Sequence, residues 1–149
     1  MADEVASRVI VGVDGSTSSL GAVGWAGDYA AATGVPITLV AAWEWPTSYG
    51  WSIPMPVDYN PSGDAQRILD DAAATLRERH PSLSVETQAV EGPPAQVLVD
   101  ASETAALLVV GCRGHGQLTG MIIGSVSERC VAHAHCPVLV YRREPKPAH

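Results

Sequence analysis

The sequence lacks the features that mark proteins of the membrane and of the secretory route. It has no run of about 18 apolar residues, which is the length that a membrane helix needs. Its first residues, MADEVASRVIVGVDG, contain no basic stretch followed by a long apolar one, as a secretory leader would. We therefore expect a cytoplasmic protein that does not bind membranes.

Positive charge is scarce. Nine Lys and Arg residues stand against 16 Asp and Glu, which gives a net charge of -7 and a pI near 5.0. The field of such a chain repels nucleic acid, so we expect no nucleic-acid partner. An anionic ligand must then be captured by local geometry rather than by long-range attraction.

Cysteine is also rare, and the count is odd: Cys112, Cys130 and Cys136. We expect reduced thiols that pack as small hydrophobic side chains. His133 and His135 lie between the last two cysteines and give this segment the look of a metal site. Because the segment crosses the expected end of a helix and no second cysteine pair is present, we predict that it binds no metal.

The 149 residues, 46% of them hydrophobic, predict one globular domain spanning 1–149, with a polar tail at 142–149. Apolar runs that predict strands alternate with helical patterns and turns. The expected strands are 8–14, 37–43, 84–90, 105–111 and 137–141, and the expected helices include 20–33, 64–79 and 125–134. Strict alternation indicates an α/β fold, Rossmann-like, in which an open five-stranded parallel sheet carries helices on both faces.

Ligands of such sheets bind at the carboxyl ends of the strands, and two candidate segments lie there. Asp14 follows the first strand, although it could equally be a turn residue. A glycine-rich loop begins at Gly111 and reaches Gly124 and Ser125 at the next helix. Glycine permits positive φ and close backbone approach, so the loop can form a nest of N–H groups, and the helix N-terminus favours an anion.

Neither common nucleotide loop is present, because no lysine precedes Ser125 and no GxGxxG follows a strand. Backbone dipoles would then hold phosphate, with Arg113 as the nearest fixed positive charge. Arg113 and His115 could also be plain solvated loop residues. Ser125 could serve as a helix cap, since residues 125–128 read as a capping box.

The spacing Gly111-x2-Gly114-x9-Gly124-Ser125 resembles the G-x2-G-x9-G-S/T signature of the ATP-binding branch of the universal stress protein family. The flanking segments VIVGVDGS, LLVVGCRGHG, GSVSERC and HCPVLVY are similar to the family too. The resemblance therefore covers nearly the whole chain.

This resemblance implies a sheet of order 3-2-1-4-5, bound ATP with or without Mg²⁺, and a homodimer that pairs the last strands, 137–141. It places the base and ribose beside the first two strands and the phosphates along the glycine loop. The predicted nucleotide contacts are Gly12, Val13, Asp14, Ala42, Val110, Gly111, Arg113, Gly114, His115, Gly124, Ser125, Val126 and Ser127.

The segment 44–64 is a long insertion rich in turn residues, and it carries Trp45, Tyr49, Trp51 and Tyr59. A loop of this length is unusual in a compact domain and is often a lid or a binding surface. One hypothesis is that Trp45 or Trp51 folds toward the nucleotide or the dimer partner. The alternative is an aromatic patch that covers the edge of the core.

The expected function is that of a stress-response regulator, a switch whose bound ATP alters its conformation or its partners. Few side chains could position water or metal at a γ-phosphate, so we expect no enzyme beyond a slow intrinsic ATPase. One alternative is a dimeric interaction module without nucleotide, against which the glycines argue because glycine without a close ligand only costs conformational entropy. Another is an adenylating or ATP-hydrolysing enzyme that uses VDGSTSS as a degenerate phosphate loop.

Overall fold

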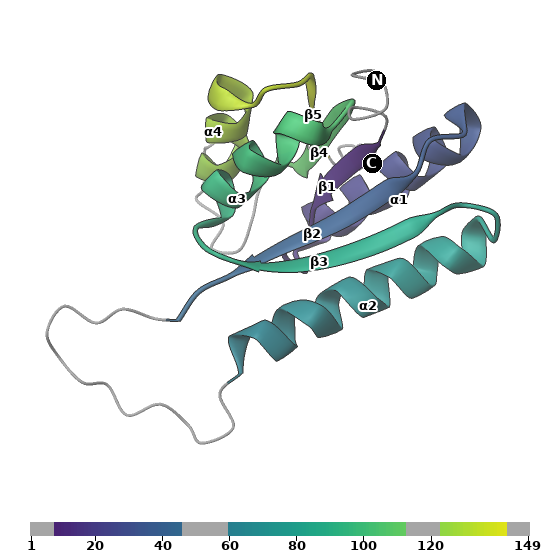
Figure 1. Cartoon of the computed structure of the whole chain (residues 1–149), viewed down its shortest axis with the longest axis horizontal. Coiled ribbons are helices and arrows are strands. Elements are labelled where there is room, and N and C mark those ends of the chain that lie inside the picture. The colour runs from purple at the N-terminus through teal and green to yellow at the C-terminus, as the bar shows by residue number, and fades with distance from the viewer. Residues whose placement is uncertain (1–7, 46–59, 113–122, 143–149) are drawn as a thin grey trace, which may run out of the picture.

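The structure is a computed structural model that describes residues 8–45, 60–112 and 123–142. Its centre is a sheet of five strands in the order β3-β2-β1-β4-β5 (Figure 1), and every neighbouring pair is parallel. The strands are β1 Val9–Gly12, β2 Ile37–Trp43, β3 Val85–Glu91, β4 Leu107–Gly111 and β5 Val138–Tyr141. The predicted Rossmann-like sheet and its strand order are confirmed.

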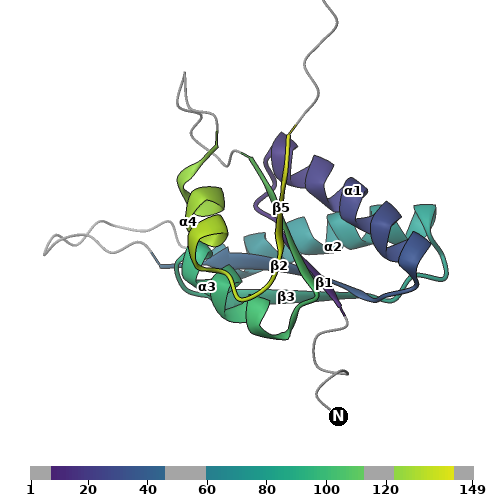
Figure 2. The same ribbon diagram turned by 90° about the horizontal axis from the view of Figure 1, so that it is seen from above.

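Helices cover both faces of the sheet, as expected for right-handed crossovers between parallel strands. In Figure 2, α1 and α2 lie on one side of the strands, and α3 and α4 lie on the other. The helices are α1 Thr17–Thr33, α2 Pro61–Arg79, α3 Pro94–Ala101 and α4 Ser125–His133, with a short 3-10 turn, η2 Ser102–Thr104, before β4. Within the described ranges, none of these helices has the length and apolar character needed to cross a membrane.

Local signals in the sequence set the two ends of α1. Ser16 is the N-cap, and its hydroxyl accepts a hydrogen bond from the N–H of Ser19 at 3.2 Å. Gly34 ends the helix in the left-handed region with φ of 77°, a conformation that costs little without a Cβ. The helix begins three residues earlier than expected, at Thr17 rather than at Leu20.

The predicted start of α2 at Asp64 is wrong by three residues. The helix begins at Pro61, and the side chain of Asn60 caps it by accepting from the N–H of Gly63 at 3.1 Å. Asparagine at the N-cap followed by proline at the first helical position is a favourable start, since proline lacks only an N–H that would have no partner there. The insertion after β2 is correspondingly shorter.

The core has two layers because side chains alternate along each central strand. On β1, Val9 and Val11 face α1 and α2, whereas Ile10 faces α3 and α4. All three side chains are completely buried. Such two-sided burial explains why β1 reads as an unbroken apolar run rather than as an alternating one.

The two edges of the sheet differ in chemistry. On β3, the side chains of Glu86, Gln88 and Glu91 are exposed, which is the charged and polar character that discourages pairing with another chain. On β5, the sequence VLVY is wholly apolar and every side chain is half-buried. Of the two edges, only β5 is therefore suited to pair with a further strand.

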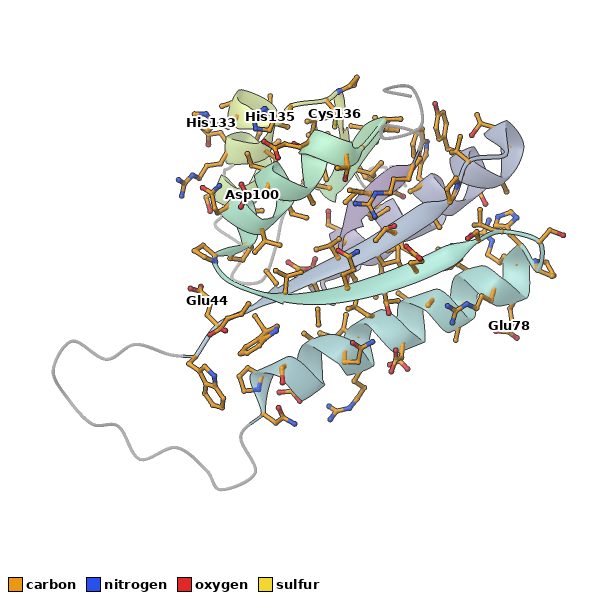
Figure 3. The ribbon with its side chains drawn as sticks, viewed as in Figure 1. Glu44, Glu78, Asp100, His133, His135 and Cys136 are labelled. Atoms are coloured by element: carbon orange, nitrogen blue, oxygen red, sulfur yellow. The ribbon has the colours of Figure 1, made fainter. Side chains whose placement is uncertain are left out.

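The three cysteines are free thiols. Cys112 and Cys130 are buried, as predicted, and Cys136 is half-buried. Figure 3 shows His133, His135 and Cys136 around the C-terminal end of α4, while Cys130 is completely buried in the layer beneath α3 and α4. Among the described residues, no group of three or more His, Cys, Asp or Glu side chains is placed to hold a metal ion.

Burial also predicts a loss of stability in alkali. It raises the pKa of the Cys130 thiol from 9.0 to about 11. Because the pKa is higher in the folded state, the thiol ionises first in the unfolded chain as the pH rises. Its contribution to the free energy of unfolding is therefore complete below pH 9 and is lost as the pH rises to 11. The loss amounts to about 2 kcal/mol.

The variant Cys130→Ala cannot ionise at this position, so it isolates the effect. We expect the free energy of unfolding of the wild type to fall toward that of Cys130→Ala between pH 8 and pH 11. Urea unfolding at several pH values measures this difference. A difference that does not change with pH would contradict the assignment.

Candidate functional site

The candidate site lies where β1 and β4 end side by side. The two strands pair in parallel, with Val11 opposite Val109, and the chain leaves them for helices on opposite faces of the sheet, α1 after β1 and α4 after the loop that follows β4. This is the point at which strand order reverses, and ligands of open α/β sheets bind at such a point. The fold therefore brings the ends of β1 and β4 together at the place where the sequence predicts the site.

At the end of β1, Asp14 sits in a tight turn. Val13 is buried, and its N–H donates to the carbonyl of Val40 at 2.8 Å. The carboxylate Oδ1 of Asp14 accepts from the N–H of Ser16 at 2.9 Å, and Gly15 adopts a φ of 83°. Asp14 therefore stabilises the turn, which fixes its carboxylate beside the N-terminus of α1, while its contact with a nucleotide stays a prediction.

Four of the predicted contacts belong to the layer between the sheet and helices α3 and α4: Gly12, Ala42 and Val110 on the strands, and Val126 on α4. Gly12 is in close contact with α3, because a Cβ at this position would lie 2.7 Å from Cδ1 of Leu98. A side chain at position 12 would therefore require Leu98 to move. Contact of these residues with a nucleotide stays a prediction.

Gly111 ends β4 against the first turn of α1. A Cβ on Gly111 would lie 2.8 Å from the backbone C of Ser18 and 2.8 Å from the backbone N of Ser19. Left-handed φ values occur among the described glycines at Gly15, Gly34 and Gly92, and not at Gly111. Of the two properties of glycine considered for the loop, positive φ does not apply at Gly111, and close approach of a helix is what excludes a side chain.

Cys112 ties both ends of the glycine loop to the fold. Its N–H donates to the carbonyl of Tyr141 on β5 at 2.9 Å, and its carbonyl accepts from the N–H of Gly124 at 2.5 Å. The hydroxyl of Ser18 donates to its Sγ at 3.6 Å. One residue thus joins the end of β4 to β5, to α1 and to the start of α4.

Three predicted contacts, Arg113, Gly114 and His115, lie outside the described residues. Their proposed roles rest on the sequence alone.

The start of α4 differs from the predicted capping box. Gly124 occupies the N-cap with φ of -78° and ψ of 167°, no side chain caps the helix, and Ser125 is its first residue. The carbonyl of Gly124 accepts from the N–H of Glu128 at 2.9 Å. A Ser125 cap is therefore wrong by one position, because Gly124 already has the extended backbone that an N-cap requires.

The correction leaves the anion-binding character of this helix end intact. The first N–H groups of a helix have no acceptor within it, and the helix dipole is positive there. Those groups belong to Ser125, Val126 and Ser127, and the side chain of Ser125 is exposed.

The hydroxyl of Ser127 is directed into the protein. The residue is 3% exposed, and its Oγ donates a hydrogen bond to the carbonyl of Gly111. Ser127 is one of the nucleotide contacts predicted in the sequence analysis. The sequence contains no signal for this internal partner.

The aromatic insertion begins at the end of β2, which Glu44 marks in Figure 3. Trp45 is 52% exposed and meets the ring of Trp43 edge-on, with 6.3 Å between ring centroids. Trp43 packs in turn on the core beneath α1 and α2. This contact fits the alternative of an aromatic patch at the edge of the core, while Tyr49, Trp51 and Tyr59 lie outside the described residues.

The family model for the universal stress protein family matches residues 6–142. The chain belongs to the universal stress protein family. Universal stress protein Rv2623 of Mycobacterium tuberculosis is 37% identical over 140 residues, which cover 90% of this chain and 44% of that protein. The chain thus spans less than half the length of such curated universal stress proteins.

Solved structures of universal stress proteins share the fold. One, in complex with cAMP, superposes with a TM-score of 0.70 at 29% identity and covers 94% of this chain and 99% of its own. Another, from Archaeoglobus fulgidus in complex with dAMP, gives a TM-score of 0.68 at 22% identity over 92% of this chain and 98% of its own. Both bound ligands are adenine nucleotides.

Proposed function

We propose that this universal stress protein chain binds ATP at the carboxyl ends of β1 and β4 and acts as a nucleotide-dependent switch. The observation that carries the proposal is the meeting of two strand ends with the N-terminus of α4, spanned by the signature from Gly111 to Ser125. The adenine nucleotides bound by structural neighbours support it.

The electrostatics favour one orientation of the ligand. The carboxylate of Asp14 lies at the end of β1, where it repels phosphate but can accept hydrogen bonds from ribose hydroxyls. The N–H groups at the start of α4 attract phosphate. The ribose would therefore lie toward Asp14, and the phosphates toward Ser125.

Magnesium would be held mainly by the nucleotide. Mg²⁺ commonly takes one or two carboxylates together with substrate phosphates and water. No cluster of metal-ligating side chains exists within the described ranges, and Asp14 is the carboxylate at this end of β1. These side chains fit a Mg²⁺ ion that binds together with ATP, and they do not fit an ion that the protein holds by itself.

We propose no catalytic role. In the proposed orientation the Asp14 carboxylate would bind the ribose, away from the γ-phosphate, and the Ser127 hydroxyl donates to the carbonyl of Gly111, so neither would act as a base for water at a γ-phosphate. A signalling or partner-binding role for the nucleotide-bound state follows from the same proposal.

Calorimetric titration with ATP, ADP, AMP and cAMP, with and without Mg²⁺, tests the function. We expect saturable binding of one nucleotide per chain, and nucleotide should be recovered by extraction of the purified protein. An absence of binding at millimolar concentrations of every ligand would leave the interaction module as the better account.

We also propose that two copies pair through β5. The apolar, half-buried VLVY edge supports this pairing, and the charged β3 edge does not offer an equivalent surface. Sedimentation equilibrium over a range of protein concentrations tests the proposal, which a monomer at every concentration would contradict.

A further inference from the structure

Ser127 joins α4 to the end of β4 through one buried hydrogen bond. Its Oγ donates to the carbonyl of Gly111, 16 residues earlier in the sequence. The hydroxyl lies in the interior, since the residue is 3% exposed. The hydroxyl therefore binds the end of β4 within the protein and does not face solvent.

The position of Gly111 is fixed from the other side as well. The backbone of Ser18 and Ser19 in α1 lies so close that a Cβ on Gly111 would have no room. Since α1 blocks movement of the strand end on one side, the bond from Ser127 locates the first turn of α4 relative to a fixed point. A second hydrogen bond, from the N–H of Gly124 to the carbonyl of Cys112 at 2.5 Å, holds the N-cap residue of α4.

We propose that Ser127 is a positioning residue of the nucleotide site. Its hydroxyl holds the first turn of α4 so that the N–H groups of Ser125 and Val126 are aimed at the phosphates, and it makes no contact with the nucleotide itself. The inference rests on the proposed ATP site and assigns to Ser127 a role other than ligand contact.

Two effects follow for the variant Ser127→Ala. Without nucleotide, the carbonyl of Gly111 loses a donor, so the midpoint of thermal unfolding should fall by about 3–5 °C. With nucleotide, the loosened helix end is less preorganised, so the affinity for ATP should fall about tenfold. The affinity for adenosine should stay unchanged, because adenosine has no phosphate for the helix end to meet.

Ser102→Ala is the matched control. Ser102 is 1% exposed, and its hydroxyl donates to the carbonyl of Val99 at 2.6 Å and accepts from the N–H of His135 at 2.9 Å. It lies before β4, at the opposite end of the strand from the site. We expect this variant to lose stability to a similar extent while its affinity for ATP is unchanged.

The experiment compares three proteins, the wild type, Ser127→Ala and Ser102→Ala, by three measurements. These are the thermal midpoint without nucleotide, amide hydrogen exchange over α4 without nucleotide, and the dissociation constants for adenosine, AMP and ATP. The proposal requires a lower midpoint in both variants. It requires faster exchange at the start of α4, and an affinity loss that grows with the number of phosphates, in Ser127→Ala alone.

Each other result overturns the proposal. Weaker ATP binding with an unchanged midpoint and unchanged exchange would show direct contact between Ser127 and phosphate. A lower midpoint with unchanged affinity, or an equal affinity loss for adenosine and ATP, would show a purely structural role. Failure of the wild type to bind any nucleotide would instead overturn the proposed function, which separates the two conclusions.

Discussion

Replacing Ser125 by aspartate should weaken ATP binding by about 30- to 100-fold without harming the fold. Ser125 is the first residue of α4, and its side chain is exposed, so the new carboxylate needs no space in the core. A negative charge in the first turn interacts favourably with the helix dipole and stabilises the fold by about 0.3–1 kcal/mol. The same charge lies within a few ångströms of the proposed phosphates, where like charges repel by about 2–3 kcal/mol at partial solvent exposure.

The prediction separates ligand binding from stability, because the affinity for ATP should fall while the stability of the fold should rise slightly. Calorimetry with ATP and adenosine measures the first, and thermal unfolding measures the second. Val131→Asp is the control: Val131 is 55% exposed on the same helix, about 9 Å further along its axis, where salt screens most of the repulsion. Equal ATP affinities for the wild type and Ser125→Asp would remove the start of α4 from the site.

Replacing Gly111 by alanine should destabilise the domain by about 2–3 kcal/mol. The added Cβ would lie 2.8 Å from backbone atoms of Ser18 and Ser19. Backbone cannot rotate away as the end of a side chain can, so α1 or β4 must shift, and overpacking of this kind costs about 1–3 kcal/mol. Chemical unfolding of the nucleotide-free protein measures the loss.

For Gly24→Ala, a substitution within α1 itself, we expect a gain of stability instead. A Cβ on Gly24 would meet only Nη1 of Arg79, at an ordinary contact distance of 3.5 Å. Alanine within a helix is favoured over glycine by about 0.5–1 kcal/mol, so this variant should be more stable than the wild type. Stability of Gly111→Ala equal to or above that of the wild type would refute the packing account of Gly111.

The packing account also changes an argument drawn from the sequence. Intact glycines appeared to favour a bound nucleotide over an empty interaction module. Gly111 is, however, required by its contact with the backbone of α1. Only the glycines beyond Gly111 in the signature can carry that argument, and of these the structure describes Gly124.

Much of the fold could be predicted from local pattern. The strand Ile37–Trp43 is predicted with its bounds as the structure has them, and Ser16 and Gly34 mark the cap and stop of α1. Two-sided burial of the central strands produces apolar runs that are easy to recognise. The strand order came from the family resemblance, because alternation alone specifies parallel crossovers and not which strands are neighbours.

The fine structure of the site could not be predicted in this way. The partner of Ser127 is a backbone carbonyl on a strand 16 residues away, and the contact that requires glycine at position 111 comes from a helix more than 90 residues earlier in the chain. Such contacts depend on the three-dimensional packing of separate elements. By contrast, Asn60 followed by Pro61 is a local signal that could have corrected the start of α2.

The central place of β1 in the sheet has a consequence for how the domain assembles. Val9 pairs with Ile37 on one side and with Leu107 on the other, so the second pairing closes a loop of about 98 residues. Contacts of such high sequence separation slow folding, because the chain entropy is lost before the contacts reward it. We therefore predict that the two halves of the proposed site come together late in folding, when the sheet is completed, and that a partly folded chain would lack the proposed nucleotide site.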